Sequence, residues 1–325
     1  MLDKKNLRIV FLGTPDFAVA TLDALIKNDF NVVGVITAPD RRGGRGMKTK
    51  IESAVKKYAQ SLNLPILQPT NLKNQEFQSE LRALRADIQI VVAFRMLPMA
   101  VWDMPPLGTY NLHASLLPKY RGAAPIHWAI IRGESYSGIT TFKLKHAIDT
   151  GSIALQKRIE IAPGDYLNDV HDRLMTEGAD LIIRTLDAVL KSELALIEQN
   201  ESGVTKAPKI FHDDCKVDFN RDTWSVYNQI RGLSPFPVAW TTFDDQKLKI
   251  YRATYAEHRH KLAPGTMLTD KKTYLAIATN DGLIFMNVIQ LQGKKKMSVK
   301  DFLNGLQIKE NNLSFLLRSE SPWSS

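Results

Sequence analysis

The chain has 325 residues, of which 44% are apolar and 24% charged, which is long enough for two domains and ordinary for a globular protein. The single cysteine, Cys215, excludes an internal disulfide framework and a cysteine-built zinc site, and no apolar run reaches the length of a signal peptide or membrane span, so the cytoplasm is the expected compartment. The net charge of +9 is concentrated in residues 206–325, which hold 18 Lys and Arg against 12 Asp and Glu, so a basic module and a polyanionic partner are expected.

Residues 7–12 form a continuous apolar run, LRIVFL, and predict a buried parallel strand. Gly13 ends this strand, and the following helix is expected to be capped by Thr14, with Pro15 at its first position. The run VVGVIT at 32–37 predicts the next strand. This arrangement is typical of a doubly wound α/β fold, but the isolated Gly13 does not make a G-x-G-x-x-G motif, so NAD binding is not expected.

Residues 40–50 read DRRGGRGMKTK, and their five basic residues and three glycines predict a mobile loop. Met47 separates Gly46 from Lys48, so the segment does not match the phosphate-binding P-loop. Its position after a strand suggests a loop that closes over a nucleic-acid end, where phosphates or bases would meet Arg41, Arg42 and Arg45. A solvated surface loop is the alternative.

The next elements continue the α/β pattern. Helical periodicity covers residues 51–62 and 76–84, and a short edge strand is expected at 65–67. Residues 88–93 predict a central strand. The loop at 94–98 then lies at the carboxyl edge of the sheet, where open α/β folds bind ligands.

Residues 110–122, YNLHASLLPKYRG, follow a Pro-Pro-Leu-Gly turn and predict the end of a strand that runs out into a loop. Side-chain alternation places Asn111, His113 and Ser115 on one side. An amide and an imidazole aimed at one point can both donate hydrogen bonds to the oxygen that becomes anionic in an acyl transfer. The alternative is a buried histidine beside a satisfied asparagine. A helix is expected to follow from Pro125.

Strands are predicted at 138–145 and 153–161, on either side of Asp149-Thr150-Gly151. Asp149 can supply the carboxylate that the amide and imidazole lack, by orienting His113 and favouring its protonated form. A single Asp-Thr-Gly does not make an aspartic protease, which needs two carboxylates that share a proton. No group of His, Asp and Glu has convincing metal spacing, so no metal is expected.

The C-terminal part begins after a long amphipathic helix at 170–190. A second helix is expected at 218–231, and the short alternating runs after it predict a small β-barrel that is OB-like. A short helix is expected near 299–303. The predicted organisation is a catalytic domain at 1–192, a linker at 193–208, a β-barrel domain at 209–313 and a tail at 314–325.

The string NLHASLLPKYRGAAPIHW, followed by IDTG, resembles the folate-dependent formyltransferases, which share an N-x-H-x-S-L-L-P segment and a later Asp. The string RGLSPFPVAW is similar to the C-terminal domain of the branch of this family that acts on methionyl initiator tRNA. The resemblance implies a Rossmann-like doubly wound formyltransferase domain followed by a small OB-like β-barrel domain that binds tRNA.

The resemblance also implies roles for individual residues. Asn111, His113 and Asp149 would be the catalytic residues, and 10-formyltetrahydrofolate would be the formyl donor. The folate pocket would be lined by Ser115, Leu116, Leu117, Pro118, Ala93, Phe94 and Met96. Arg95 departs from the family pattern, in which an aromatic residue is followed by glycine.

The basic loop is implied to engage the acceptor end of the tRNA, through Arg41, Arg42, Arg45 and Lys48. Further tRNA contacts are suggested only by charge and position, at Lys206, Lys209, Lys294, Lys295 and Lys296. The implied reaction places a formyl group on the α-amino group of methionyl initiator tRNA, by a monomer that needs no metal.

Two alternatives stay open on sequence grounds. The first is a formyltransferase for a small amine, such as a nucleotide sugar or glycinamide ribonucleotide. The second is an RNA-binding module whose active site has decayed. A steep salt dependence of binding separates tRNA from a small acceptor, and a single-turnover formylation assay tests the decayed module.

Overall fold

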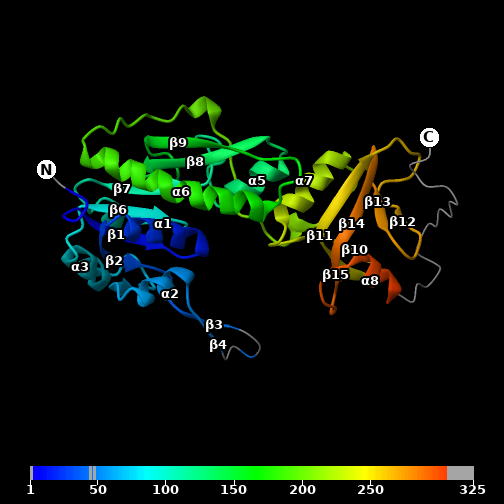
Figure 1. The fold of residues 1–325 in the computed structure, drawn as a ribbon, viewed down its shortest axis with the longest axis horizontal. Helices are drawn as coiled ribbons and strands as arrows, with labels where there is room; N and C mark the ends of the chain where they lie inside the picture. Colours follow the sequence, from blue (N-terminus) through cyan, green and yellow to red (C-terminus); the bar gives the residue numbers. More distant parts are fainter. Residues whose placement is uncertain (1–2, 44–45, 47–48, 306–325) are drawn as a thin grey trace. The chain divides into compact units, whose positions relative to one another are not determined.

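The computed structural model describes residues 3–43, 46 and 49–305. Contacts divide them into two compact units (Figure 1). The first contains residues 3–125, 136–160 and 171–208, and the second contains 126–135, 161–170 and 209–305. Arg45, Lys48 and the tail expected at 314–325 lie outside the described residues.

The first unit is built on a seven-stranded sheet with the order β5-β2-β1-β6-β7-β8-β9. The strands are β1 (Arg8–Gly13), β2 (Asn31–Ile36), β5 (Ile66–Leu67), β6 (Ile88–Val92), β7 (Thr109–His113), β8 (Tyr136–Lys143) and β9 (Ile153–Glu160). The neighbours from β5 to β7 pair in parallel, whereas β8 and β9 are added antiparallel. The predicted doubly wound α/β sheet and its short edge strand β5 are confirmed.

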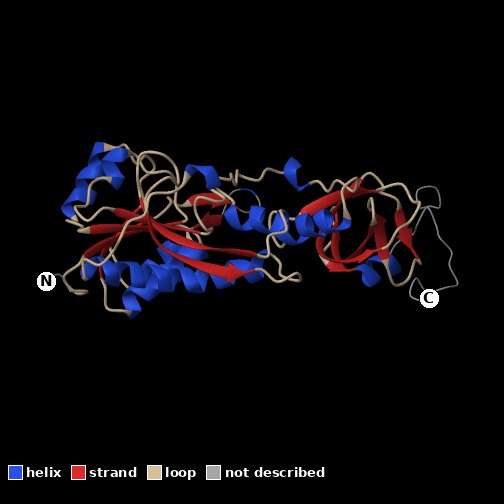
Figure 2. Ribbon diagram, turned by 90° about the horizontal axis from the view of Figure 1, so that it is seen from above, coloured by secondary structure: helices blue, strands red, loops and turns tan. Residues whose placement is uncertain are grey.

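Helices lie on both sides of this sheet (Figure 2). They are α1 (Asp16–Lys27), α2 (Ala54–Ser61), α3 (Gln75–Ala83), α4 (Met99–Trp102) and α6 (Leu167–Leu190). On one face, Leu12 and Val91 share a buried cluster with Phe77 of α3. On the other face, Leu112 packs against Gly178 of α6, where an added Cβ would lie 2.7 Å from Leu112 Cδ2.

The turn after β1 differs from the expectation in one detail. Pro15 occupies the N-cap of α1 with no side-chain cap, so the predicted capping by Thr14 is wrong. The Thr14 carbonyl instead accepts a hydrogen bond from Val55 N at 3.4 Å. A Cβ on Gly13 would lie 2.6 Å from Ala18 Cβ, so this glycine permits close packing of strand and helix.

The basic segment at 40–50 was predicted to be a loop throughout, but part of it forms paired strands. It contains a hairpin of β3 (Arg41–Gly43) and β4 (Thr49–Ile51). The helix predicted at 51–62 therefore begins only at Ala54. Ion pairs hold the base of the hairpin: Asp40 Oδ2 lies 2.5 Å from Lys56 Nζ and 2.9 Å from Lys50 Nζ. The Lys56 side chain is only 8% exposed, so this pairing is largely shielded from solvent.

These ion pairs predict a pH dependence of stability. Hydrogen bonds from Gln68, Lys56 and Lys50 hold the pKa of Asp40 well below its usual value, and those from Lys56 and Lys50 lower the pKa of Glu52. Groups with depressed pKa values in the folded protein stabilise it above their unfolded values of about 4, and this stabilisation is lost as the pH falls through the folded values. The substitution Lys56→Met is therefore expected to lower the unfolding temperature at pH 7, with the difference from the wild type narrowing below about pH 4. Calorimetry over this range tests it, and a difference that stayed constant would contradict it.

The second unit is an antiparallel sheet with three helices. The strands are β10 (Ala239–Phe243), β11 (Gln246–Glu257), β12 (Met267–Thr269), β13 (Leu275–Ala278), β14 (Gly282–Leu291) and β15 (Met297–Ser298), and the helices are α5 (Pro125–Ile131), α7 (Thr223–Leu233) and α8 (Val299–Asn304). The strand order is β10-β11-β14-β13-β12, and β15 pairs with β14. Ile230 of α7 and Phe302 of α8 share one buried cluster with Ile250 and Ile289 of the sheet.

This arrangement confirms the predicted fold class, an α/β domain followed by a small antiparallel β domain that forms a half-barrel. The helices expected from Pro125 and near 299–303 are also confirmed. Within the second unit, β12 and β15 were not predicted, because three and two residues are too short to show a side-chain alternation.

Candidate active site

Strand β7 places an amide and an imidazole on the same face of the first sheet. Asn111 pairs with Val91 in the parallel β6–β7 register, so both side chains lie on the face opposite to α6. His113 follows two residues later on the same face and is buried, whereas Asn111 is partly exposed. Among the described residues, the Asn111 side chain has no hydrogen-bond partner, so its amide protons are available to a ligand.

Asp149 reaches this face from the loop between β8 and β9. Strand β8 ends at Lys143, which lies opposite Tyr110 near the start of β7. His113 is at the other end of β7, so the loop after β8 must turn back along β7 to bring Asp149 to it. Asp149 does so with a φ of 54°. Its Oδ2 lies 3.9 Å from His113 Nδ1 and accepts a hydrogen bond from Gly122 N at 2.9 Å. The predicted neighbourhood of His113 and Asp149 is therefore present.

The other nitrogen of His113 contacts the main chain. His113 Nε2 lies 2.9 Å from the carbonyl oxygen of Tyr120. Because a carbonyl oxygen only accepts hydrogen bonds, Nε2 carries the proton in this contact. The ring is thus oriented by Tyr120 on one side and faces the Asp149 carboxylate on the other.

Residues 115–118 form a rigid segment after β7. The hydroxyl of Ser115 donates to Lys119 O at 2.6 Å, and Thr140 Oγ1 both donates to Ser115 O at 2.6 Å and accepts from Leu117 N at 3.1 Å. The Gln156 amide donates to Leu117 O at 2.9 Å. Ser115 and Leu117 are buried, so they shape the segment, while Leu116 and Pro118 are partly exposed.

The loop after β6 lies at the carboxyl end of the neighbouring strand. Ala93 has a φ of 47° and is exposed, Phe94 is partly exposed, and Met96 is 75% exposed. Arg95 donates to the carbonyl oxygens of Thr70, at 2.9 Å, and Pro69. Partial burial lowers the pKa of Arg95. The unexpected arginine is therefore bound to the neighbouring loop.

The basic residues predicted to contact RNA fall in separate places. Arg41 and Arg42 are exposed on β3, and Lys206 and Lys209 are exposed near the end of the segment that follows α6. The remaining three, Lys294, Lys295 and Lys296, are exposed between β14 and β15. Lys296 Nζ lies 4.4 Å from the ring centre of Tyr251.

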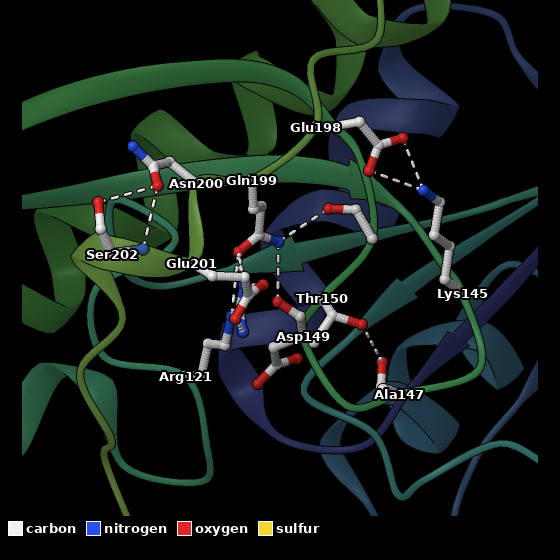
Figure 3. A network of polar contacts seen from close by, with 11 residues as sticks. Arg121, Lys145, Ala147, Asp149, Thr150, Glu198, Gln199, Asn200, Glu201 and Ser202 are labelled. Atoms are coloured by element: carbon white, nitrogen blue, oxygen red, sulfur yellow. Dashed lines mark hydrogen bonds and ion pairs between the residues drawn. The ribbon is translucent and has the colours of Figure 1, made fainter.

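Sequence reasoning missed several residues that hold the site. They are Tyr120, Gly122, Thr140, Gln156 and Gln199. Tyr120 contacts His113 through its carbonyl oxygen, and the other four make hydrogen bonds to segments more distant in the chain. Gln199 donates to main-chain carbonyls of the Asp149 loop (Figure 3). Apart from Gly122, none of these residues belongs to a recognisable local pattern. Gly122 had a signal in the Arg-Gly that follows the strand, which was read only as the end of a loop.

The described residues contain no group of three or more His, Cys, Asp and Glu placed to hold a metal ion. No described helix combines the length and the apolar character needed to cross a membrane.

Two family models match this chain. The model described as formyl transferase matches residues 7–186, and the model described as formyl transferase, C-terminal domain, matches residues 209–307. The first match covers the strand that carries Asn111 and His113 and the loop that carries Asp149. The chain belongs to the formyl transferase family.

Relatives of known name show which branch of the family this chain is most similar to. The chain is 51% identical over 316 residues to the methionyl-tRNA formyltransferase of Parabacteroides distasonis, covering 94% of this chain and 98% of that protein. It is 49% identical over 318 residues to the methionyl-tRNA formyltransferase of Bacteroides fragilis, covering 95% and 98%. Within the family, the chain therefore groups with the methionyl-tRNA formyltransferases.

A solved structure supports the fold alone. The N-formyltransferase of Helicobacter canadensis, in complex with folinic acid and dTDP-3-aminofucose, is 21% identical and superposes with a TM-score of 0.65 over 86% of this chain and 98% of that chain.

Proposed function

We propose that this protein transfers the formyl group of 10-formyltetrahydrofolate to the α-amino group of the methionine carried by initiator tRNA. One observation carries the proposal: the amide of Asn111, which bonds to none of the described residues, lies on the same strand face as His113, whose Nδ1 is 3.9 Å from Asp149 Oδ2. The identity of about half of all residues to methionyl-tRNA formyltransferases supports this choice of substrate.

In this reaction the amine attacks the formyl carbon, and the bond from that carbon to the folate nitrogen then breaks. The formyl oxygen becomes anionic in between, and hydrogen-bond donors already aimed at it lower the barrier. Asn111 can donate an amide proton to this oxygen without giving up a protein contact. The amine loses one proton overall, and the departing folate nitrogen gains one.

His113 is the second donor in the proposal. Its Nε2 proton is directed at Tyr120 O. Donation to the oxyanion therefore requires this proton to be shared between Tyr120 O and the oxyanion, or its hydrogen bond to Tyr120 O to break. Asp149 stabilises the cationic ring across the opposite nitrogen and accepts the proton of the attacking amine through a water molecule. No covalent intermediate with the protein is needed.

We propose that the folate lies along the carboxyl ends of β6 and β7. Leu116 and Pro118 would contact it from one segment, and Ala93, Phe94 and Met96 from the other. Their partial or full exposure supports this assignment, and the internal hydrogen bonds of 115–118 keep that wall in place. Ser115 and Leu117 would act by shaping the wall.

We propose that the tRNA is bound by a cytoplasmic monomer, with the β3–β4 hairpin at the acceptor end. The test is formylation of charged initiator tRNA beside charged elongator methionine tRNA, a nucleotide amino sugar and glycinamide ribonucleotide, each with the same formyl donor. Initiator tRNA is expected to react at least tenfold faster than the elongator. Preferential reaction of either small amine would overturn the assignment, and no formylation of any acceptor would support the decayed module.

The hairpin provides a prediction about RNA binding. Replacing exposed Arg42 by Ala is expected to weaken tRNA binding and to reduce the slope of log K against log salt by about 1, because one phosphate contact is lost. Titration of labelled tRNA at several salt concentrations measures the slope. The matched control is Arg82→Ala, at an exposed position on α3. An equal effect of both variants would show that Arg42 contributes only general charge.

A further inference from the structure

The segment that follows α6 is bound to the catalytic loop. The Gln199 side-chain amide donates to Asp149 O at 2.8 Å and to Gly151 O at 2.8 Å (Figure 3). Its two amide protons therefore hold the main chain on both sides of Thr150. Asp149 has the left-handed φ of 54°, an unfavourable conformation for a residue other than glycine that persists only where the surroundings fix it.

The other end of the Gln199 side chain is fixed by Arg121. The carbonyl oxygen of Gln199 accepts from Arg121 Nη2 at 2.8 Å and from Nε at 3.1 Å. Arg121 also pairs with Glu201 at 2.8 Å. Its main chain is bound to the same segment, with Arg121 N donating to Thr205 O at 2.9 Å and Ala207 N donating to Arg121 O at 2.8 Å.

Arg121 stands between the two residues that touch the catalytic side chains. Tyr120 O contacts His113 Nε2, and Gly122 N donates to Asp149 Oδ2. Gln199 thus fixes Asp149 in two ways. It bonds directly to the main-chain carbonyls of the Asp149 loop, and it bonds to Arg121, whose neighbour Gly122 binds the Asp149 carboxylate. A displaced carboxylate would no longer face the imidazole.

We infer that Gln199 is a positioning residue, which holds the main chain of Asp149 so that its carboxylate faces His113 during formyl transfer. The kinetic test of this inference rests on the proposed function, whereas the hydrogen-exchange test does not. An amide side chain suits this position, because its nitrogen donates to the carbonyl oxygens of Asp149 and Gly151 and its oxygen accepts from the Arg121 guanidinium. A glutamate keeps the acceptor for Arg121 but brings a charged oxygen against two carbonyl oxygens.

The test compares Gln199→Glu with Asn200→Asp, the same change from amide to carboxylate one residue later. Among the residues that the structure describes, the Asn200 oxygen accepts hydrogen bonds from Ser202 N and Ser202 Oγ alone, within its own turn, and a carboxylate keeps both contacts. Gln199→Glu is expected to lower kcat about thirtyfold or more while KM for both substrates changes less than about threefold, because misplacement of a group by about 1 Å can cost about a hundredfold. Asn200→Asp is expected to retain the wild-type kcat.

A double-mutant cycle shows whether Gln199 acts through Asp149. In the Asp149→Ala background, Gln199→Glu is expected to have no further effect on kcat, since residues that act together are not additive. A full thirtyfold loss in that background would overturn the inference. So would a wild-type kcat for Gln199→Glu alone, or equal losses in Gln199→Glu and Asn200→Asp.

Hydrogen exchange tests the contact without using activity. Gln199→Glu is expected to speed exchange in the peptide that contains residues 144–152 at least tenfold, and Asn200→Asp to leave it unchanged. Unchanged exchange in Gln199→Glu would overturn the inference. If the wild-type protein did not formylate methionyl-tRNA, the proposed function would fail while this measurement would still decide the role of Gln199.

Discussion

Replacement of His113 by Ala is expected to lower kcat for formylation a hundredfold or more, with Asn111→Ala giving a loss of similar size. Loss of one donor to a developing oxyanion typically costs about 3 to 4 kcal/mol of barrier. The effect on folding is expected to be small for Asn111, whose side chain is partly exposed and bonds to no described residue. The measurement is single-turnover formylation at saturating substrate.

The two variants differ in what they leave behind. His113→Ala also removes the imidazole that bonds to Tyr120 O, and loss of a buried hydrogen bond costs about 1 to 3 kcal/mol of stability, so the unfolding of this variant must be measured beside its rate. Asn111→Asp is the matched control, because it keeps the shape of the side chain and removes both donors. A wild-type rate in purified Asn111→Ala, or recovery of the rate in Asn111→Asp, would contradict the oxyanion role.

Gly151→Ala is expected to lower kcat by about a hundredfold and to lower the unfolding temperature, because the loop has no room for a methyl group. An added Cβ would lie 1.8 Å from the main-chain oxygen of Lys143 and 2.9 Å from its carbonyl carbon. Main-chain atoms within a strand cannot move aside as a side chain can, so the loop that carries Asp149 must shift. The displacement expected is of the size that costs about two decades in rate.

The matched control is Gly164→Ala, where an added Cβ meets no atom within 4 Å. This variant is expected to keep the wild-type rate and unfolding temperature. Kinetics and calorimetry on both variants make the comparison. A Gly151→Ala protein that stayed fully active would mean that the position of the Asp149 loop does not limit the reaction.

Local patterns were sufficient for the parts of the fold that follow strand and helix periodicity. The alternation along β7 correctly placed Asn111 and His113 on one face, and the apolar runs located β1, β2 and β6. The expectation that Asp149 faces His113 agrees with the 3.9 Å between Asp149 Oδ2 and His113 Nδ1, whereas the catalytic roles of these residues were implied only by the family resemblance. The glycine of the Asp-Thr-Gly motif is explained by the close approach of Lys143 O, which no sequence pattern reveals.

The failures come from contacts that a local sequence pattern does not show. The hairpin at 41–51 depends on ion pairs from Asp40 to Lys50 and to Lys56 of α2. Such pairs are invisible to a local count of glycines and basic residues. The orientation of His113 depends on a carbonyl seven residues away in a loop without regular structure. Thr14 failed as a cap because tertiary packing decided the start of α1.

The contacts of residues 199–207 bear on how this protein can be divided or recombined. The segment leads from α6 to the second unit, yet it is hydrogen-bonded to residues of the first unit, among them Arg121, Asp149 and Gly151. A gene fragment that stops at residue 192 would encode the three proposed catalytic residues, Asn111, His113 and Asp149, and would lack Gln199, which we infer positions the Asp149 loop. Shuffling of domains between homologues should therefore place the crossover beyond Pro208.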